Sequence, residues 1–431
     1  MSTLCRYPPM RILHTADWHL GHRLYDRERT EEHRAALDWL LDTIEREQVD
    51  LLIVAGDVFD VTNPSNQARE LYYDFLGRLL RTGCSAAVVV GGNHDSAAML
   101  DAPSGLLRSL QLHVVGAART PVQSEVVRIE VGRSDPQAVF VAAVPYLRER
   151  DLRKGTFGGD TDERLATLRN GIRDHYRAVA AAAEKLRDDP TLPILATGHL
   201  FASGAEDDAE KKSHIYQADE HNIEGGQFPE CFDYVALGHV HRAQSVDGRA
   251  HVRYSGSLVP LTFVEGQRPR SVRLVELGRA GDPVTSRKLE VPFARALHRL
   301  RGTLDEVRAE LTTLVVRARE ESPTLVPWVE IRILSDAPVP NLRQTLDEVV
   351  RETADGRGAA GPVEVVRLST ARLTPAPATA APLPQRLDEI DPADVFARLL
   401  DATGTPDEVQ RELLADFRDL RNWQSEQSAE A

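Results

Sequence analysis

The sequence contains few cysteines and no long apolar segment, and both facts exclude classes of protein. Its three cysteines in 431 residues lie far apart and form no CxxC pair, so neither a structural zinc site nor a dithiol redox centre is expected. No segment reaches the roughly 18 apolar residues of a membrane-spanning helix. The N-terminus lacks the apolar stretch of about seven residues that a signal peptide carries behind its basic start. We therefore expect a cytoplasmic protein without a membrane anchor.

Positive charge is also in short supply. The chain has 52 Lys and Arg residues against 66 Asp and Glu residues, a formal net charge of −14. Proteins that bind nucleic acid over their whole surface usually carry a basic footprint. Any contact with nucleic acid would therefore depend on a local basic patch, on bound cations or on a partner chain. The sequence also lacks GxxxxGKS or GxxxxGKT, so we expect that the chain does not hydrolyse ATP.

Short apolar runs alternate with amphipathic helices from residue 10 to about residue 292. "RILHTA", "DLLIVAG" and "AAVVVGG" are strand candidates, and the two segments between them are helix candidates. The apolar face of the first helix consists of Ala36, Leu37, Leu40, Leu41 and Ile44. Strand, helix and strand at this spacing predict right-handed crossovers and parallel pairing. With four later strand candidates, the pattern predicts an α/β fold, a central pair of β-sheets flanked by helices.

The composition changes beyond this region. Residues 293–372 alternate strand and helix patterns, which predict a small α+β domain. Residues 373–387 are rich in Pro and Ala and predict an extended linker. Residues 388–424 contain two amphipathic helices, which are too short to bury their apolar stripes alone. We expect these helices to dock on a partner, and docking on this chain is the alternative.

Residues that can bind metal ions follow five of the expected strands. In an open parallel sheet, ligands bind beyond the carboxyl ends of the strands. The residues at these ends carry carboxylate, carboxamide or imidazole groups, and they are Asp17, His19, Asp57, Asn93, His94, His199, His239 and His241. Each one alone has an ordinary structural explanation, such as a helix cap or a hydrogen-bonded histidine. Five strand ends that deliver such groups to one edge instead predict a common site.

Seven of these side chains are too many for one tetrahedral zinc and suit two divalent cations. Oxygen and imidazole donors without a thiolate favour manganese, iron or zinc over calcium. Asp57, on the middle of the first three strands, is the candidate to bridge the cations. The two remaining sets of ligands, one for each cation, are Asp17, His19 and His241, and Asn93, His199 and His239. Two cations about 4 Å apart activate water and neutralise a phosphate, so the pattern predicts phosphoester hydrolysis.

"VVVGGNHD" places a histidine beside these ligands that the metal count does not use. The two glycines let the backbone turn tightly, so that Asn93 and His94 both face the cations. His94 is a candidate proton donor to the leaving oxygen, because imidazole titrates near the working pH. Asp60 is a candidate to orient the His94 ring. The alternative for Asp60 is a turn or cap residue.

Five motifs in order give a resemblance to a known superfamily. D-x-H at 17–19, GD-x-x-D at 56–60, GNHD at 92–95, GH at 198–199 and GH-x-H at 238–241 resemble the motifs of the calcineurin-like metallophosphoesterases. The resemblance implies a metallophosphoesterase β-sandwich flanked by helices, and the metal ligands expected above agree with the pattern of that family. Within the superfamily, residues 10–270 resemble the SbcD family of nuclease subunits.

This second resemblance implies a substrate and partners. It implies a nuclease that uses two divalent metal ions, with Mn²⁺ as the expected metal, and acts on double-stranded DNA ends as a 3′-5′ exonuclease. It also implies endonuclease activity on hairpins and single strands, in DNA repair and recombination. The small α+β domain would be a capping domain that faces DNA, and the C-terminal helices would bind the coiled-coil ATPase SbcC. A homodimer within a heterotetramer with SbcC is expected on the same basis.

The DNA contacts and the exact activity leave alternatives open. Arg23, Tyr25, Arg27 and Arg29, just beyond the first metal motif, are candidate phosphate contacts, and a solvated loop and helix start is the alternative. A metallophosphoesterase of small molecules or phosphoproteins would share the metal site but not the DNA. A non-catalytic scaffold with a degenerate site is disfavoured by the complete ligand set and by His94.

Overall fold

The computed structural model describes residues 9–131, 137–152, 161–203, 223–353 and 361–372, together with short helical stretches between 396 and 417. The chain divides into two units, residues 1–371 and residues 372–431. None of the helices in the described ranges has both the length and the hydropathy that crossing a membrane requires.

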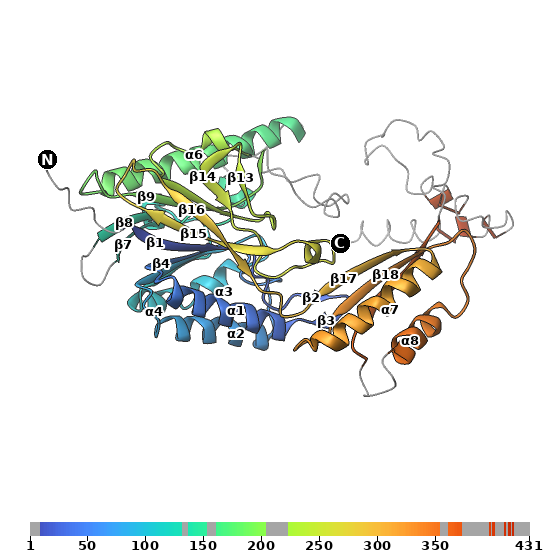
Figure 1. Cartoon of the computed structure of the whole chain (residues 1–431). Helices are drawn as coiled ribbons and strands as arrows, with labels where there is room; N and C mark the ends of the chain where they lie inside the picture. The colour runs from blue at the N-terminus through green and yellow to red at the C-terminus, as the bar shows by residue number, and fades with distance from the viewer. Residues whose placement is uncertain are drawn as a thin grey trace. The chain divides into compact units, whose positions relative to one another are not determined.

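The first sheet has six strands in the order β16-β15-β1-β4-β5-β6 (Figure 1). Their bounds are β1 Met10–Thr15, β4 Leu51–Ala55, β5 Ala86–Val90, β6 Leu112–Val115, β15 Arg270–Leu277 and β16 Thr285–Val291. Strands β1, β4, β5 and β6 pair in parallel, as the helical crossovers predict, whereas β15 pairs antiparallel with β1 and with β16. The connecting helices are α1 Thr30–Arg46, α2 Asn66–Leu79, α3 Ala97–Asp101 and α4 Ser104–Ser109.

The second sheet also has six strands, in the order β13-β14-β12-β9-β8-β7. Their bounds are β7 Val126–Val131, β8 Gln137–Ala142, β9 Ile194–His199, β12 Tyr234–Gly238, β13 Gln244–Val246 and β14 Arg249–Tyr254. Helices α5 Glu149–Leu152 and α6 Thr161–Leu186 lie between β8 and β9, and the short strands β10 Ala202–Ser203 and β11 Ile223–Glu224 follow β9. Strands β8, β9, β12 and β14 are parallel to one another.

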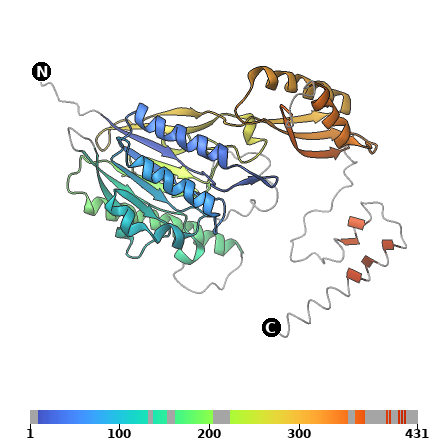
Figure 2. The ribbon, with the colours of Figure 1, turned by 90° about the horizontal axis from the view of Figure 1, so that it is seen from below.

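The two sheets pack face to face, with helices on both outer faces. Apolar side chains from both sheets, among them Ile12, Val88 and Val141, form one core between them. The buried face of α1, which includes Leu37 and Leu40, packs with α2 against the first sheet. Helix α6 packs against the second sheet. Figures 1 and 2 show these layers, with α1 and α2 in blue on one side and α6 in green on the other. The predicted α/β fold is confirmed.

A separate small sheet follows the sandwich. Its order is β17-β18-β19, all parallel, and the elements run β17 Leu297–Gly302, α7 Leu304–Glu321, β18 Trp328–Leu334, α8 Leu342–Thr353 and β19 Glu364–Ala371. Thr303 caps the N-terminus of α7: its side chain accepts from the Glu306 N–H while the Glu306 carboxylate accepts from the Thr303 N–H. This capping box satisfies two backbone donors that the first turn leaves free. The sheet and its helices have a core of their own.

A short hairpin connects β1 to α1. Strands β2 Arg23–Leu24 and β3 Arg27–Glu28 flank Tyr25 and Asp26, both with positive φ, as in the two-residue turns that hairpins prefer. Leu24 packs with Phe263, Leu297 and Trp328 in a small apolar cluster. The hairpin therefore contacts the region where the small sheet begins.

The C-terminal unit is described only in part. The linker expected at 373–387 lies outside the described residues. Beyond it, the described stretches are helical, and the rings of Phe396 and Phe417 stack with centroids 4.7 Å apart. Leu399, Val409 and Leu413 are exposed.

Candidate metal centre

The carboxyl ends of strands from both sheets deliver the candidate ligands to one place. Asp17 and His19 follow β1, Asp57 follows β4, and Asn93 follows β5 in the first sheet. The second sheet contributes the three remaining histidines, His199 at the end of β9 and His239 and His241 after β12. The structure brings all seven together.

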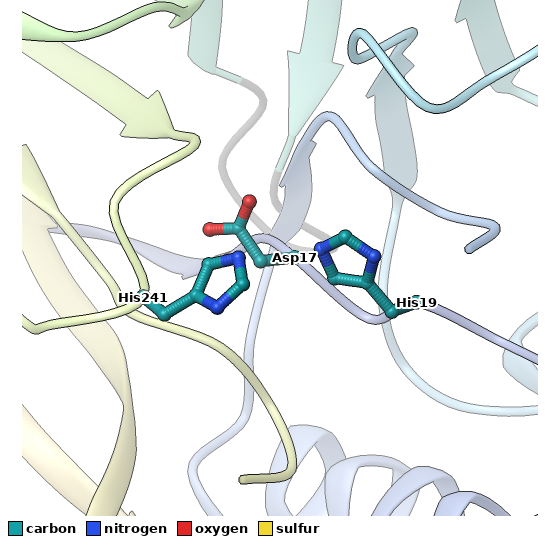
Figure 3. A group of neighbouring side chains, drawn as sticks. All are labelled: Asp17, His19 and His241. Atoms are coloured by element: carbon teal, nitrogen blue, oxygen red, sulfur yellow. The ribbon is translucent and has the colours of Figure 1, made fainter. Parts of the chain in front are cut away.

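Three groups of side chains within this cluster have their potential ligand atoms within 4.8 Å of one another. They are Asp17, His19 and His241; His19, Asp57 and His94; and Asp57, His199 and His239. Figure 3 shows the first group, with the Asp17 carboxylate beside the two imidazoles. The groups overlap at His19 and Asp57, so the cluster is one continuous site.

Asp57 lies at the centre of the cluster. Its Oδ2 is 3.5 Å from His19 Nε2 and 3.2 Å from His199 Nε2. On the far side, Asn93 Oδ1 lies 3.0 Å from His199 Nε2 and 3.1 Å from His239 Nδ1. One carboxylate oxygen therefore stands between the two halves of the site, the position that a bridging ligand requires.

The backbone at the site is held in an uncommon conformation. Asp17, His19, Asp57 and His239 have φ values of 52°, 47°, 48° and 94°, in the left-handed region that side chains other than glycine rarely occupy. Such residues cost about 1–3 kcal/mol each and cluster at functional sites. The fold therefore stabilises a backbone geometry here that local preferences oppose.

Gly92 is required by the close approach of the β4 and β5 ends. A Cβ atom at this position would lie 2.1 Å from Asp57 Oδ1 and 2.3 Å from the Asp57 nitrogen. Both distances are far below van der Waals contact, and one of the atoms belongs to the backbone. The glycine before Asn93 thus lets the two ligand-bearing loops meet.

Two of the histidine rings in the cluster are held in place by a contact of Nδ1, which leaves Nε2 to face the site. His199 Nδ1 lies 2.9 Å from the Ala55 carbonyl oxygen, and His241 Nδ1 lies 3.0 Å from Glu265 Oε1. Contacts of this kind set the tautomer and orientation of metal-binding imidazoles. The buried Glu265 also contacts Arg270 and was not predicted from the sequence. Glu265 ends the segment "YSGSLVPLTFVE", which resembles the SbcD family, but its residue type alone does not predict a contact with His241.

The contact of Asp60 with His94 differs from the one that the sequence predicts. His94 Nδ1 lies 2.7 Å from the backbone carbonyl oxygen of Asp60, whereas the Asp60 carboxylate lies 3.2 Å from His19 Nδ1. A carbonyl only accepts, so it fixes the proton of the neutral His94 ring on Nδ1. The backbone of Asp60 therefore holds His94, and its side chain contacts a different histidine.

Asp95 is a second residue whose part the sequence did not reveal. Its fully buried carboxylate accepts from the N–H groups of Val58, Phe59 and Gly92. Hydrogen bonds of this kind join the loop after β4 to the loop after β5. Asp95 thus stabilises the contact between the two loops that carry Asp57 and Asn93.

The buried charges favour an ionised carboxylate at the centre. Burial alone would raise the pKa of Asp57, but the imidazoles of His199 and His19 lower it well below its usual range. Against the opposing effect of burial, the charge of Asp57 raises the pKa of His199 to about 9. The carboxylate therefore remains charged and attracts cations.

The donor set fits divalent metal ions. Asp17 Oδ2 and His19 Nε2 are buried and have no hydrogen-bond partner in the described part of the chain. Buried polar atoms without partners are costly, and a cation beside them would satisfy both. Carboxylate, carboxamide and imidazole donors without a thiolate suit borderline and hard divalent metals.

The candidate DNA contacts fall into two kinds. Arg23, Tyr25 and Arg27 lie exposed on the hairpin, where Tyr25 Oη donates to Glu330 and Arg27 pairs with Glu364 at 2.6 Å. Arg29 is only 1% exposed, and its guanidinium donates to Glu32 and to the Pro260 carbonyl. The prediction for Arg29 is therefore wrong, since a guanidinium buried in this way cannot reach a DNA phosphate.

Comparison with known families agrees with this geometry. Residues 10–243 match the calcineurin-like phosphoesterase family, and residues 294–403 match a family described as type 5 capsule protein repressor C-terminal domain. The fold and the site thus define a calcineurin-like phosphoesterase, a hydrolase that acts on phosphodiester bonds.

Three relatives narrow the assignment, and each is named as the SbcD component of the nuclease SbcCD. The protein from Escherichia coli K12 is 36% identical over 406 residues, 94% of this chain and 96% of the relative. The protein from Rhodobacter capsulatus is 36% identical over 404 residues, which are 90% of this chain and 94% of the relative. The protein from Bacillus subtilis is 35% identical over 283 residues, which are 64% of this chain and 68% of the relative. The chain belongs to the SbcD family of nuclease subunits.

Proposed function

We propose that the chain is the nuclease subunit of an SbcCD complex and hydrolyses phosphodiesters of DNA with two Mn²⁺ ions. It acts as a 3′-5′ exonuclease on double-stranded ends and as an endonuclease on hairpins and single strands. The observation that carries the proposal is the convergence of six further ligand side chains around Asp57, with Asp17 Oδ2 and His19 Nε2 buried and unpartnered among the described residues. Because its proposed substrate is chromosomal DNA, we place the protein in the cytoplasm.

The chain's own residues divide the work of holding the cations. Asp17, His19 and His241 would hold one, Asn93, His199 and His239 would hold the other, and Asp57 would serve both. The distances of Asp57 Oδ2 to imidazoles on either side support this division. When bound, two such cations supply Lewis acidity to the phosphate and lower the pKa of water. Asn93 adds a ligand without charge and so limits the negative charge of the site.

His94 moves the proton that the departing oxygen needs. The Asp60 carbonyl, 2.7 Å from Nδ1, leaves Nε2 as the atom that gains and gives a proton. The His94 N–H donates to Asp57 Oδ1 at 2.9 Å, which fixes the backbone of the histidine against the metal site. Removing the imidazole therefore removes general acid catalysis while the ligands stay in place.

The hairpin next to His19 is the surface that we assign to the DNA backbone. Arg23, Tyr25 and Arg27 are exposed there; Glu28, which pairs with Arg23, is exposed as well, and Glu364, which pairs with Arg27, is partly exposed. Exposed ion pairs are weak, so phosphates can replace these carboxylates at small cost. Local cations of this kind, with the metals and SbcC, compensate for a net charge of −14.

The remaining parts of the chain serve the complex. We assign residues 10–292 to the nuclease domain, 293–372 to a capping domain, 373–387 to a linker and 388–424 to helices that bind SbcC. Exposed Leu399, Val409 and Leu413 on these helices support a partner surface. SbcC hydrolyses ATP, and two copies of each subunit form the heterotetramer through a homodimer of this chain.

End-labelled duplex DNA with purified chain, Mn²⁺, SbcC and ATP tests the proposal. Wild type should release label from 3′ ends, and His94→Ala should be slower by about 10²–10⁴-fold with unchanged metal content. His251→Ala, a partly buried histidine on β14, is the matched control and should cleave normally. Equal rates for wild type and His94→Ala would contradict the assignment of His94. Hydrolysis of small phosphodiesters without DNA cleavage would favour a small-molecule enzyme.

A further inference from the structure

Cationic side chains gather where β14 of the second sheet faces β15 and β16 of the first. Arg273 on β15 lies directly opposite Lys288 on the neighbouring strand β16, so their side chains share one face of the sheet. On the other side, Arg273 lies opposite His14 of the neighbouring strand β1. His14 Nδ1 lies 3.0 Å from Tyr234 Oη of the second sheet. That face of the first sheet therefore looks toward the second.

The second sheet adds a cation from its own inner face. Arg253 on β14 pairs with Ala236 on β12, and Ala236 belongs to the core between the sheets. Cross-strand partners point to the same side, so Arg253 faces the first sheet. It is close enough to Arg273 for its charge to lower the pKa of that residue. Tyr234 lies close enough to both arginines for their charges to lower its pKa, although burial raises it overall.

Arg273 is an exception to how buried charges are normally satisfied. The residue is 4% exposed, and its buried Nε makes no hydrogen bond with any residue of the described ranges. Ser286 Oγ, on the same face of β16 as Lys288, is likewise buried and unpartnered among these residues. A buried N–H without a partner costs free energy, so a fold that keeps one gains from an external acceptor such as an anion.

The cations also repel one another. Burial and the charge of Arg253 lower the pKa of Arg273, and burial together with Arg273, Arg242 and Arg253 lowers the pKa of Lys288. Glu290 acts on Lys288 in the opposite direction, but its effect is the smaller one. Such an excess of positive charge is unusual in a chain whose net charge is −14.

We propose that this edge of the sandwich binds a phosphate group, with Arg273, Arg253 and Lys288 as its charged ligands and Ser286 as a hydroxyl donor. A phosphate offers several oxygens, and guanidinium groups donate to them in pairs. The depth of Arg273 favours a terminal or free phosphate over the backbone of a duplex, which is too wide to reach a buried guanidinium. None of these residues belongs to the metal centre, so the inference is independent of the nuclease proposal.

Calorimetric titration of the full-length chain in EDTA with inorganic phosphate tests the site, because EDTA removes metals that would bind phosphate elsewhere. We expect saturable binding by wild type that weakens at least about tenfold in Arg273→Met and in Lys288→Ala. Arg287→Met is the matched control, since Arg287 lies on the opposite face of β16 and pairs with Glu47. Asp57→Asn should bind phosphate like wild type. Short single strands with and without a 5′ phosphate distinguish a terminal phosphate of DNA from free phosphate.

Thermal unfolding provides a second readout. Phosphate should raise the melting temperature of wild type and of Arg287→Met, but not that of Arg273→Met. In the absence of phosphate, Arg273→Met should melt at or above the wild-type temperature, because a buried N–H without an acceptor has been removed. The proposal is overturned if wild type does not bind phosphate, or if Arg273→Met and Lys288→Ala bind it as tightly as wild type. Neither result would bear on DNA cleavage at the metal centre.

Discussion

Replacing Glu32 by alanine is expected to destabilise the fold strongly, because Glu32 holds two arginines in a buried position. Glu32 Oε1 lies 3.3 Å from Arg29 Nε and 2.8 Å from Arg295 Nε. Arg29 and Glu32 are almost completely buried, and Arg295 also stacks on Trp328, with its guanidinium carbon 4.3 Å from the ring centroid. The cluster thus joins α1 to the start of the small sheet.

The size of the effect follows from what the substitution leaves behind. Removing one partner of a buried ion pair costs about 3–5 kcal/mol, because the remaining charge stays desolvated without compensation. In a unit of this size, roughly 2 °C of melting temperature is lost per kcal/mol, so the midpoint should fall by about 6–10 °C. Adding Arg29→Met to Glu32→Ala should recover part of this loss, since one unpaired charge is then absent.

Differential scanning calorimetry of Glu32→Ala beside Glu31→Ala provides the measurement. Glu31 is exposed and lies 3.9 Å from the same Arg295, so its loss should cost no more than about 1 kcal/mol. Equal shifts for the two variants would refute the reasoning that burial gives the Glu32 cluster its weight.

Three further substitutions probe the site and the core. Gly92→Ala should fold but lose metal and at least about 100-fold of its activity, because the added Cβ collides with Asp57; metal content and DNA cleavage measure this. Glu265→Gln should weaken metal binding about 10–100-fold by loosening His241, as competition with a chelator would report. His14 is buried and neutral, with a pKa lowered by burial to about 3, so the unfolded chain binds more protons between pH 3 and 6.5. The free energy of unfolding should fall as the pH drops through this window, by up to about 1.4 kcal/mol per pH unit from this residue. Urea unfolding at several pH values measures this, and the free energy of unfolding of His14→Gln should depend less steeply on pH.

The sequence was sufficient to predict the elements that bring the ligands together. Apolar runs that end in polar residues mark the carboxyl ends of β1, β4, β5, β9 and β12, and helical periodicity marks the crossovers. Ligands at the ends of strands can therefore be predicted from the local sequence pattern. The antiparallel strands β15 and β16 were not identified, because β15 pairs with a strand near the opposite end of the domain sequence, β1, and no local pattern specifies such a partner.

Contacts made through the backbone or across long distances could not be predicted from the sequence. The Asp60 carbonyl, rather than its carboxylate, holds His94, and reasoning from side-chain types cannot anticipate this. Arg29 resembles a solvated residue at a helix start, but it is buried where it donates to the Pro260 carbonyl, far along the chain. Asp95 lies in the bend after β5 and Glu265 opens the short 3-10 helix Glu265–Gln267, and neither position specifies its contacts in the sequence. Only the folded structure reveals what they support.

Electron paramagnetic resonance of the metal-free chain titrated with Mn²⁺ tests the central claim most directly. The arrangement around Asp57 predicts two Mn²⁺ per chain with a spin-coupled signal, because one carboxylate oxygen stands between both ligand sets. Asp57→Asn should lose the coupling. A single Mn²⁺ per chain, or two uncoupled ions in wild type, would contradict the account.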